Sequence, residues 1–477
     1  TGWAAYSLLK AYDTWPESFA DRDSRDYGGS SNGIPDILDE VKVATDYLIK
    51  LHPDSETMVA RVGGSQDHDT WLTSPYQSTL SVARGGGKRP VLAGGEADIC
   101  GICAAALALM ATLYEVHDPL YADTCLAAAE SIYELGGGRQ GATDDPDDFY
   151  QKSGWKDAML CGAVELFRAT NQQRYLQEAK QWNTYQSHGW VMGWSNFWDA
   201  GRHSLVKAGD TGAQAAWQED VDDYLERISS AGYVEGMAYF AEWGSLASAT
   251  SAAFSAALMY EVTGEEKYRE FVFSQADYVM GHNEYDRSFI IGFGKTPPTH
   301  PHHANAYGYD AINWDLSKEP KHTLAGALVG GPTRYGHGNG VTSPGYEDDI
   351  HDYWGNEVAL DYNAGLVGTL ALCAAESATA VSSPLSAQKA ERLQVSPVYP
   401  NPAAVLIHLR YVLTCEAEVE IQLSDISGRQ RESREVFHRG AGEYNQIISV
   451  DEFATGVYLL SVRAGSHRET QKIVITH

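Results

Sequence analysis

Three stretches of similar form decide the fold: LYEVHDPLY at residues 113–121, LFRATNQQRY at 166–175 and MYEVTGEEKY at 259–268. In each, an apolar run ends in a short polar turn, and an aromatic residue opens the next run. This arrangement predicts a helix, a tight turn and a second helix. Repeated helical hairpins must stack to bury their apolar faces. Because their spacing is irregular, we expect a closed helical barrel with long loop insertions.

The composition of the chain and the spacing of its apolar residues change near its end. Residues 377–394 are small and polar, which predicts a linker. Beyond them the apolar period becomes two, as in Val419–Leu423 and Leu460–Arg463. We therefore expect a mainly α barrel domain over 1–376, a linker over 377–394 and a small all-β sandwich over 395–477.

Charge limits the partners of this chain. Its 477 residues hold 35 Lys and Arg against 64 Asp and Glu, a net charge of −29. Residues 395–477 are nearly neutral, so the acidity belongs to the helical part. This balance argues against nucleic acid and against an anionic membrane surface as partners. Twelve Trp and 28 Tyr beside many carboxylates are typical of carbohydrate-binding proteins. The sequence contains no run of about 18 consecutive apolar residues, so no membrane span is predicted.

Cys100 and Cys103 form a C-x-x-C pair. A metal or redox pair is one interpretation, but no second Cys or His pair lies nearby. The surrounding Gly, Ile and Ala residues favour two small, buried helix residues.

The densest cluster of chemically active side chains lies between residues 282 and 364. Carboxylates there alternate with Tyr, Trp and His on Gly-rich segments, which suits sugar binding and acid–base chemistry. Glu357 precedes an apolar run from Val358 to Leu366, so we expect it at the opening of a helix. A catalytic acid and a carboxylate that caps this helix are both open at this point.

The cluster resembles family nine of the glycoside hydrolases, best known for cellulases. Every position of the family's second signature is matched, by Tyr346, Asp348, Tyr353, Glu357, Ala359, Asn363 and Ala364. The first signature is matched in part, by Ser288, Gly294, Pro301 and His302, whereas Ile291, Thr296 and Ala304 depart from it. The resemblance covers roughly 1–376, and it implies an (α/α)6 barrel.

The resemblance also implies roles for individual residues. Glu357 corresponds to the general acid, Asp348 to a second active-site carboxylate and His302 to a substrate-binding histidine. Ala304 stands where the family usually has Arg, which puts the usual preference for long glucans in doubt. The substrate-binding candidates nearby are His303, Trp314, Tyr353 and Trp354.

One motif of the family has no counterpart. The family's water-activating Asp lies in a Gly-Gly-Trp-x-Asp-Ala-Gly-Asp segment upstream of a helix that resembles residues 3–7. We therefore expect this chain to be an N-terminally truncated copy of an active enzyme, and turnover of a soluble glucan by residues 1–477 alone would contradict this. Trp198–Arg202 resembles part of the motif, although its position in the chain does not fit.

Other residues have open interpretations. Trp71, Trp194 and Trp198 are as compatible with core packing as with sugar stacking. Asp67, His68 and Asp69 could ligate a structural calcium ion, although an ordinary acidic loop is the alternative. The resemblance implies that catalysis requires no cofactor.

The tail resembles the C-terminal sorting domain of bacterial type IX secretion. The resemblance rests on segments at 395–403, 425–429, 456–459 and 472–475. It implies a secreted or cell-surface bacterial protein with the type IX machinery as a partner. A carbohydrate-binding module is the alternative, but the tail has no Trp and no evident aromatic stripe.

Together these features predict a hydrolase of β-linked glucans that acts on cellulose-like polysaccharides or oligosaccharides by an inverting acid–base mechanism. An exo-acting β-glucosidase or glucosaminidase on short oligosaccharides is the nearest alternative. A non-catalytic glycan-binding derivative is the alternative from another class of protein.

Overall fold

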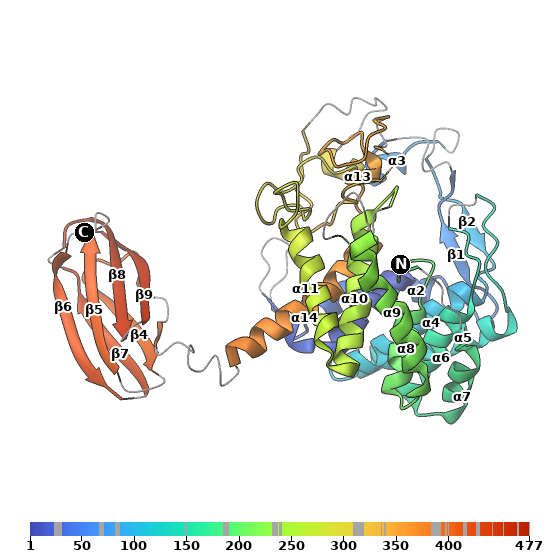
Figure 1. Ribbon diagram of the computed structural model, residues 1–477, viewed down its shortest axis with the longest axis horizontal. Helices are drawn as coiled ribbons and strands as arrows, with labels where there is room; N and C mark the ends of the chain where they lie inside the picture. Colours follow the sequence, from blue (N-terminus) through green and yellow to red (C-terminus); the bar gives the residue numbers. More distant parts are fainter. Residues whose placement is uncertain are drawn as a thin grey trace. The chain divides into compact units, whose positions relative to one another are not determined.

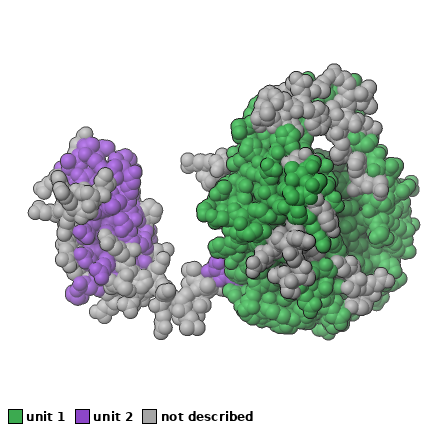
Figure 2. Space-filling view, turned by 45° about the horizontal axis from the view of Figure 1, so that its top comes forward, with its two compact units in different colours: residues 1–375 green, residues 376–477 purple. Residues whose placement is uncertain are grey.

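The structure is a computed structural model that divides into two compact units, Thr1–Ala375 and Glu376–His477 (Figure 2). It describes the whole chain apart from residues 23–30, 66–70, 82–85, 148–149, 185–189, 231–236, 238–240, 309–318, 335, 338–339, 383–392, 396–397, 399, 414–416, 426–429, 441, 452, 465–466 and 477.

The first unit is built from helices (Figure 1). Their bounds are α1 (Gly2–Thr14), the short 3-10 helix η1 (Pro16–Ser18), α2 (Asp36–Lys50), α3 (Ser74–Gln77), α4 (Ala97–Tyr114), α5 (Pro119–Gly138), α6 (Lys156–Thr170), α7 (Gln173–Trp182), α8 (Trp198–Lys207), α9 (Gly212–Ser230), α10 (Ser245–Thr263), α11 (Glu266–Met280), α12 (Ala304–Tyr307), α13 (Tyr353–Asn356) and α14 (Leu360–Ser382). Strands β1 (Val59–Val62) and β2 (Val91–Ala93) form a small two-stranded antiparallel sheet.

The three predicted helical hairpins are confirmed as α4–α5, α6–α7 and α10–α11. Each has a local reason to turn. Asp118 accepts the N–H groups of Leu120 and Tyr121, both at 3.1 Å, and so caps α5. Asn171 and Gly264 end α6 and α10 in the left-handed conformation, with φ of 55° and 69°.

Helices α4, α6 and α10 form the centre of the first unit, buried on nearly every side. Small residues let α4 and α6 cross closely, because a Cβ on Gly101 would lie 2.4 Å from the backbone carbon of Ala158. Among the helices that the structure describes, α4 alone is apolar and long enough to cross a membrane, but 83% of that stretch is buried in the unit. It is therefore a core helix.

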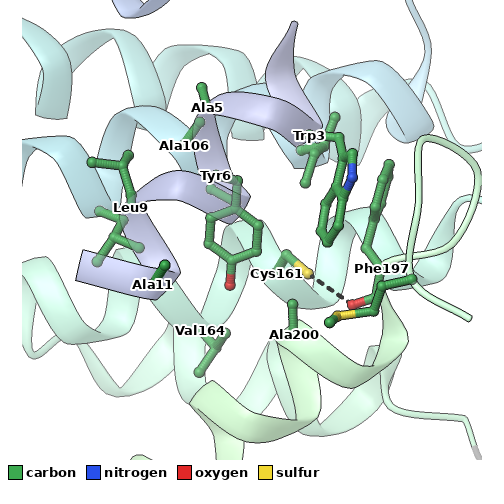
Figure 3. Packing of buried hydrophobic residues seen from close by; sticks show 14 of the residues in the cluster. Trp3, Ala5, Tyr6, Leu9, Ala11, Ala106, Cys161, Val164, Phe197 and Ala200 are labelled. Carbon is green, nitrogen blue, oxygen red and sulfur yellow. Dashed lines mark hydrogen bonds between the residues drawn. The ribbon is translucent and has the colours of Figure 1, made fainter. Parts of the chain in front are cut away.

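Cys100 and Cys103 lie on this core helix, as the sequence predicts for small buried residues. Burial raises the pKa of both thiols, that of Cys103 to about 12. Figure 3 shows the neighbouring part of the core, where Trp3 of α1 stacks on Phe197 with ring centres 5.4 Å apart. Aromatic packing of this kind joins the start of α1 to the segment before α8.

The second unit is the predicted β-sandwich. Its strands are β3 (Leu393–Val395), β4 (Leu406–Leu413), β5 (Ala417–Asp425), β6 (Gln430–Arg439), β7 (Gly442–Ser449), β8 (Gly456–Ala464) and β9 (His467–Ile475). They form two antiparallel sheets in the orders β3-β4-β7 and β6-β5-β8-β9. Val419, Ile421 and Leu423 are buried on one face of β5, which confirms the alternation read from the sequence.

Helix α14 continues to Ser382, inside the stretch expected to be a linker, and residues 383–392 lie outside the description. At the other end of α14, long segments gather with α3 and α13 at one end of the helical unit (Figure 1). These segments carry the candidate site.

Candidate active site

Short backbone contacts, rather than a regular sheet, bring the candidate residues together. His302 and Glu357 form a parallel bridge, in which the N–H of His302 donates to the carbonyl of Asn356 at 2.8 Å. On the other side, the N–H of Gly330 donates to the carbonyl of Glu357 at 3.1 Å. Glu357 is thus held between two segments that are distant from it in the sequence.

Glu357 lies at the end of α13 and not at the opening of the next helix, because α14 begins only at Leu360. Its backbone is extended, with φ of −62° and ψ of 144°. The carboxylate accepts a hydrogen bond from Nε1 of Trp243 at 2.7 Å and a longer one from the Tyr362 hydroxyl at 3.5 Å. These contacts orient the carboxylate from outside its own helix.

Trp243 is a site residue that the sequence interpretation missed. Its indole is about half exposed and lies against Tyr353 and Trp354, with ring centres 5.4 and 6.3 Å away. The next residue, Gly244, has φ of 62°, and a Cβ there would lie 2.8 Å from the Tyr362 hydroxyl. A Trp-Gly pair just before an apolar helix was the only signal that could have indicated this residue.

Asp348 is surrounded by hydrogen-bond donors. It accepts the N–H groups of Thr299 and His300, both at 2.9 Å, and the Thr299 hydroxyl at 3.0 Å. The guanidinium of Arg287 lies 3.2 Å away. Burial alone would raise the pKa of Asp348, but these donors and the Arg287 charge hold it below the ordinary value. Asp348 therefore stays ionised and fixes the segment that leads to His302.

His302 is held in one orientation. Its Nδ1 lies 2.6 Å from the carbonyl oxygen of Ile350, which can only accept, so Nδ1 carries a proton. The ring lies between Trp71 and Tyr353, with ring centres 4.2 and 5.7 Å away. Burial is the main cause that lowers the pKa of His302. The neutral ring therefore has an acceptor at Nε2.

The other predicted substrate contacts divide into three groups. Tyr353 and Trp354 are part of α13 and contact Trp243. His303 precedes α12, burial lowers the pKa of its ring, and no hydrogen-bond partner for its Nδ1 is found among the described residues. Trp314 lies outside the described residues.

A hollow of about 400 Å³ lies beside this group. Tyr150 and Trp194 line it and meet edge to face, with ring centres 5.5 Å apart. Burial and then the negative charges of Glu357 and Asp361 raise the pKa of the Tyr150 hydroxyl. Asp361 also lines the hollow, and burial raises the pKa of its carboxyl. The sequence interpretation did not single out Tyr150 or Asp361.

The three Trp residues with open interpretations have different surroundings. Trp71 contacts His302 and Trp194 lines the hollow, whereas Trp198 lies at the start of α8 and packs on the core. The next residue, Asp199, is fully buried and accepts the hydroxyls of Ser255 and Tyr224 at 2.7 and 3.1 Å. Its place in the core does not suit a residue that activates water.

The calcium prediction cannot be compared with the structure, because Asp67, His68 and Asp69 lie outside the described ranges. Within those ranges, no three His, Cys, Asp or Glu side chains are grouped so as to hold a metal ion.

The helical fold and this arrangement of carboxylates, imidazole and indoles define a glycoside hydrolase domain. Residues 1–370 match the family model of glycosyl hydrolase family 9, and the chain belongs to that family. Residues 397–476 match the secretion system C-terminal sorting domain, which indicates a bacterial protein that is secreted or held at the cell surface.

Named relatives support this assignment. The chain is 32% identical to Endoglucanase A of Bacillus pumilus over 364 residues, which are 71% of this chain and 53% of that protein. It is 32% identical to an endoglucanase of Dictyostelium discoideum over 357 residues, or 72% of this chain and 48% of that one. The chain thus spans about half the length of these relatives.

A solved structure supports the fold. The cellulase Cel9M of C. cellulolyticum in complex with cellobiose aligns with a TM-score of 0.66 and 30% identity, over 78% of this chain and 84% of that one. The expected (α/α)6 barrel is thereby confirmed.

Proposed function

We propose that the protein hydrolyses the glycosidic bonds of β-linked, cellulose-like glucans, with Glu357 as the general acid. The observation that carries this proposal is the Glu357 carboxylate, oriented by Trp243 at 2.7 Å and joined by its backbone to the His302 segment. The names of the relatives, endoglucanases and a cellulase in complex with cellobiose, support the substrate class.

The chemistry follows from the needs of the bond. A glycosidic oxygen leaves readily only when it is protonated, and Glu357 would supply that proton. An inverting mechanism also requires a carboxylate on the opposite face of the sugar, about 6.5–9.5 Å from the acid, to activate water. Asp348 does not suit that task because Thr299, His300 and Arg287 occupy its oxygens. We assign it to the charge and geometry of the site.

The remaining residues would bind the substrate. Nε2 of His302 can accept a hydrogen bond from a sugar hydroxyl, because the ring is neutral and Nδ1 is engaged with Ile350. Tyr353 and Trp354 offer aromatic faces for sugar rings, and we keep His303 and Trp314 as further contacts. Ala304 places a methyl group where a charged contact is usual in the family. No cofactor takes part in this chemistry.

The test is the substitution Glu357→Gln in the complete natural protein. Loss of the transferable proton should lower kcat on a soluble β-glucan by at least about 1000-fold, while the Kd for cellotetraose changes less than about threefold. An aryl cellobioside with an acidic leaving group serves as the control, because its departure needs little protonation and its hydrolysis should fall much less. Equal losses on both substrates would contradict the role of an acid.

Product analysis of the same wild-type protein separates the alternatives. Oligosaccharides of mixed length indicate endo action, and one short product indicates an exo-acting enzyme. Binding without any turnover by the complete protein would indicate a glycan-binding derivative and would overturn the proposal.

We propose in addition that residues 1–376 form the hydrolase domain, that 377–394 link it to the tail and that 395–477 direct export by the type IX machinery. The match of residues 397–476 supports the last of these assignments. Deletion of 395–477 should retain the protein in the periplasm, with the intact chain as control. Unchanged export of the shortened chain would contradict it.

A further inference from the structure

We propose that Asn356 is a positioning residue that sets the spacing of three segments, those of Glu357, Asp348 and His302. The inference rests on the proposed hydrolase function. Asn356 ends α13, immediately before Glu357, and its side chain is fully buried. It does not itself face a substrate, so it would act through its neighbours.

The backbone of Asn356 reaches the His302 segment. Its carbonyl accepts the N–H of His302 at 2.8 Å, and its own N–H donates to the carbonyl of Asp352 at 2.9 Å. Any shift of Asn356 would therefore move His302 and Glu357 together.

The carboxamide of Asn356 reaches the Asp348 segment. Nδ2 donates to the carbonyl of Glu347 at 2.6 Å and to that of Asp352 at 3.2 Å, while Oδ1 accepts the Tyr346 hydroxyl at 2.7 Å. Two carbonyls can only accept, so the NH2 group must face them and the orientation of the amide is fixed. Both donors and the acceptor of this side chain are used without water.

A second route joins the same amide to Asp348. The ring of Tyr346 is packed edge to face on Phe289 at 5.0 Å, and the guanidinium of Arg287 lies over it at 5.0 Å. The same guanidinium pairs with Asp348 at 3.2 Å. Asn356 is thus linked to Asp348 both through the backbone of Glu347 and through the side chains of Tyr346 and Arg287.

Asp, Leu and Gln would not reproduce these contacts. An ionised Asp would turn an oxygen toward two carbonyl oxygens, and Leu would leave the Glu347 carbonyl and the Tyr346 hydroxyl without their partner. Gln is longer by one carbon in a fully buried position. A displacement of the acid by about 1 Å is enough to lower a rate about 100-fold.

The experiment compares Asn356→Ala and Tyr346→Phe in the complete natural protein. We expect kcat on a soluble β-glucan to fall about 100-fold for N356A and about tenfold for Y346F, with KM within about threefold of the wild type. Y346F removes one hydroxyl and keeps the packed ring. If N356A does not fold, the kcat of Y346F therefore still tests the positioning role of Asn356.

Thr369→Val is the matched control. Thr369 is fully buried between α14 and α10, and its hydroxyl donates to the carbonyls of Thr250 and Gly365 at 2.8 and 2.9 Å. T369V should lower Tm while kcat stays within about twofold of the wild type. Wild-type values of kcat in folded N356A and Y346F, or an equal loss of kcat in T369V, would overturn the inference. A wild type that turns over no β-glucan would instead overturn the proposed function on which it rests.

Discussion

The indole nitrogen of Trp243 donates a hydrogen bond of 2.7 Å to Oε2 of Glu357, although 114 residues separate the two in the sequence. The ring that makes this bond is about half exposed and leans on Tyr353 and Trp354. One side chain therefore both orients the proposed acid and offers an aromatic face beside it.

Substitution of Trp243 by Phe separates these two tasks. The Phe ring keeps the aromatic contacts but has no N–H. Of the two hydrogen bonds that the Glu357 carboxylate accepts from Trp243 and Tyr362, the 3.5 Å one from Tyr362 then remains. We expect kcat on a soluble β-glucan to fall about tenfold, with KM nearly unchanged. Trp243→Ala, which also removes the ring, should raise KM in steady-state assays. An increase in KM of W243F without a decrease in its kcat would contradict the orienting role.

His302 provides a test of substrate contact. His302→Asn retains a donor for the Ile350 carbonyl and removes the acceptor nitrogen. We expect kcat/KM to fall about tenfold, equivalent to one lost hydrogen bond, and Tm to fall because the ring that packs on Trp71 and Tyr353 is lost. His302→Ala lacks the ring as well and in addition has no donor for the Ile350 carbonyl, so it should lower Tm more than His302→Asn does. Identical Tm values for the two variants would contradict a stabilising hydrogen bond to the Ile350 carbonyl, and an unchanged kcat/KM in His302→Asn would contradict the substrate contact.

Asp348 should contribute to stability in a defined pH window. Its pKa is held below the ordinary value, so the folded state binds its proton later than the unfolded state as the pH falls. The contribution is present above the unfolded pKa of about 4 and is lost below it. Asp348→Asn should therefore be less stable than the wild type at pH 7, and the difference should shrink between about pH 5 and pH 3. Urea unfolding at several pH values measures it, and a difference that stays constant with pH would contradict it.

His203 acts in a different pH window. It is buried in α8 with Nε2 3.2 Å from Glu261, and burial is the main cause that lowers its pKa to about 4. Between pH 6.5 and 4 the unfolded state takes up a proton that the folded state does not, so stability falls as the pH falls. The shift from 6.5 to about 4 corresponds to about 3 kcal/mol.

His203→Gln is the variant that checks this value. Gln keeps a donor toward Glu261 and does not titrate, so the advantage of the wild type over H203Q should decrease by about 3 kcal/mol from pH 7 to pH 4. The titration of Glu261 affects stability only below about pH 4.5. The hydrogen bond from His203 and the neighbouring Lys207 lower the pKa of Glu261 to about 2, so its contribution to stability is lost between these two values. Parallel stability curves for the two proteins would contradict the assignment.

The features that the sequence predicted well are the local ones. Asp118, Asn171 and Gly264 mark the hairpin turns because each acts on backbone within a few residues of itself. The alternation in β5 is local in the same way. The pairing of the Glu357 and His302 segments was indicated by the family resemblance, and the structure adds the bridge between their backbones.

The features that escaped prediction depend on contacts between distant segments. Nothing near Trp243 in the sequence shows that its indole meets a carboxylate beyond α10, α11 and the long segments after them. The prediction that Glu357 opens a helix was wrong. The apolar run after it suggested a helix start, but Glu357 follows the end of α13, and long-range hydrogen bonds set that end. Likewise, the burial of Asp199 in the core depends on Ser255 and Tyr224, which its own segment does not reveal.

The close crossing of α4 and α6 has a mechanical consequence. A Cβ on Gly162 would lie 2.9 Å from the carbonyl oxygen of Gly101, so at this crossing the two helices touch backbone to backbone, which leaves little room for a displacement. We therefore expect α4 and α6 to move together as one rigid unit. We expect any displacement on binding of the proposed substrate to occur in the segments that carry Glu357 and His302, and not between α4 and α6.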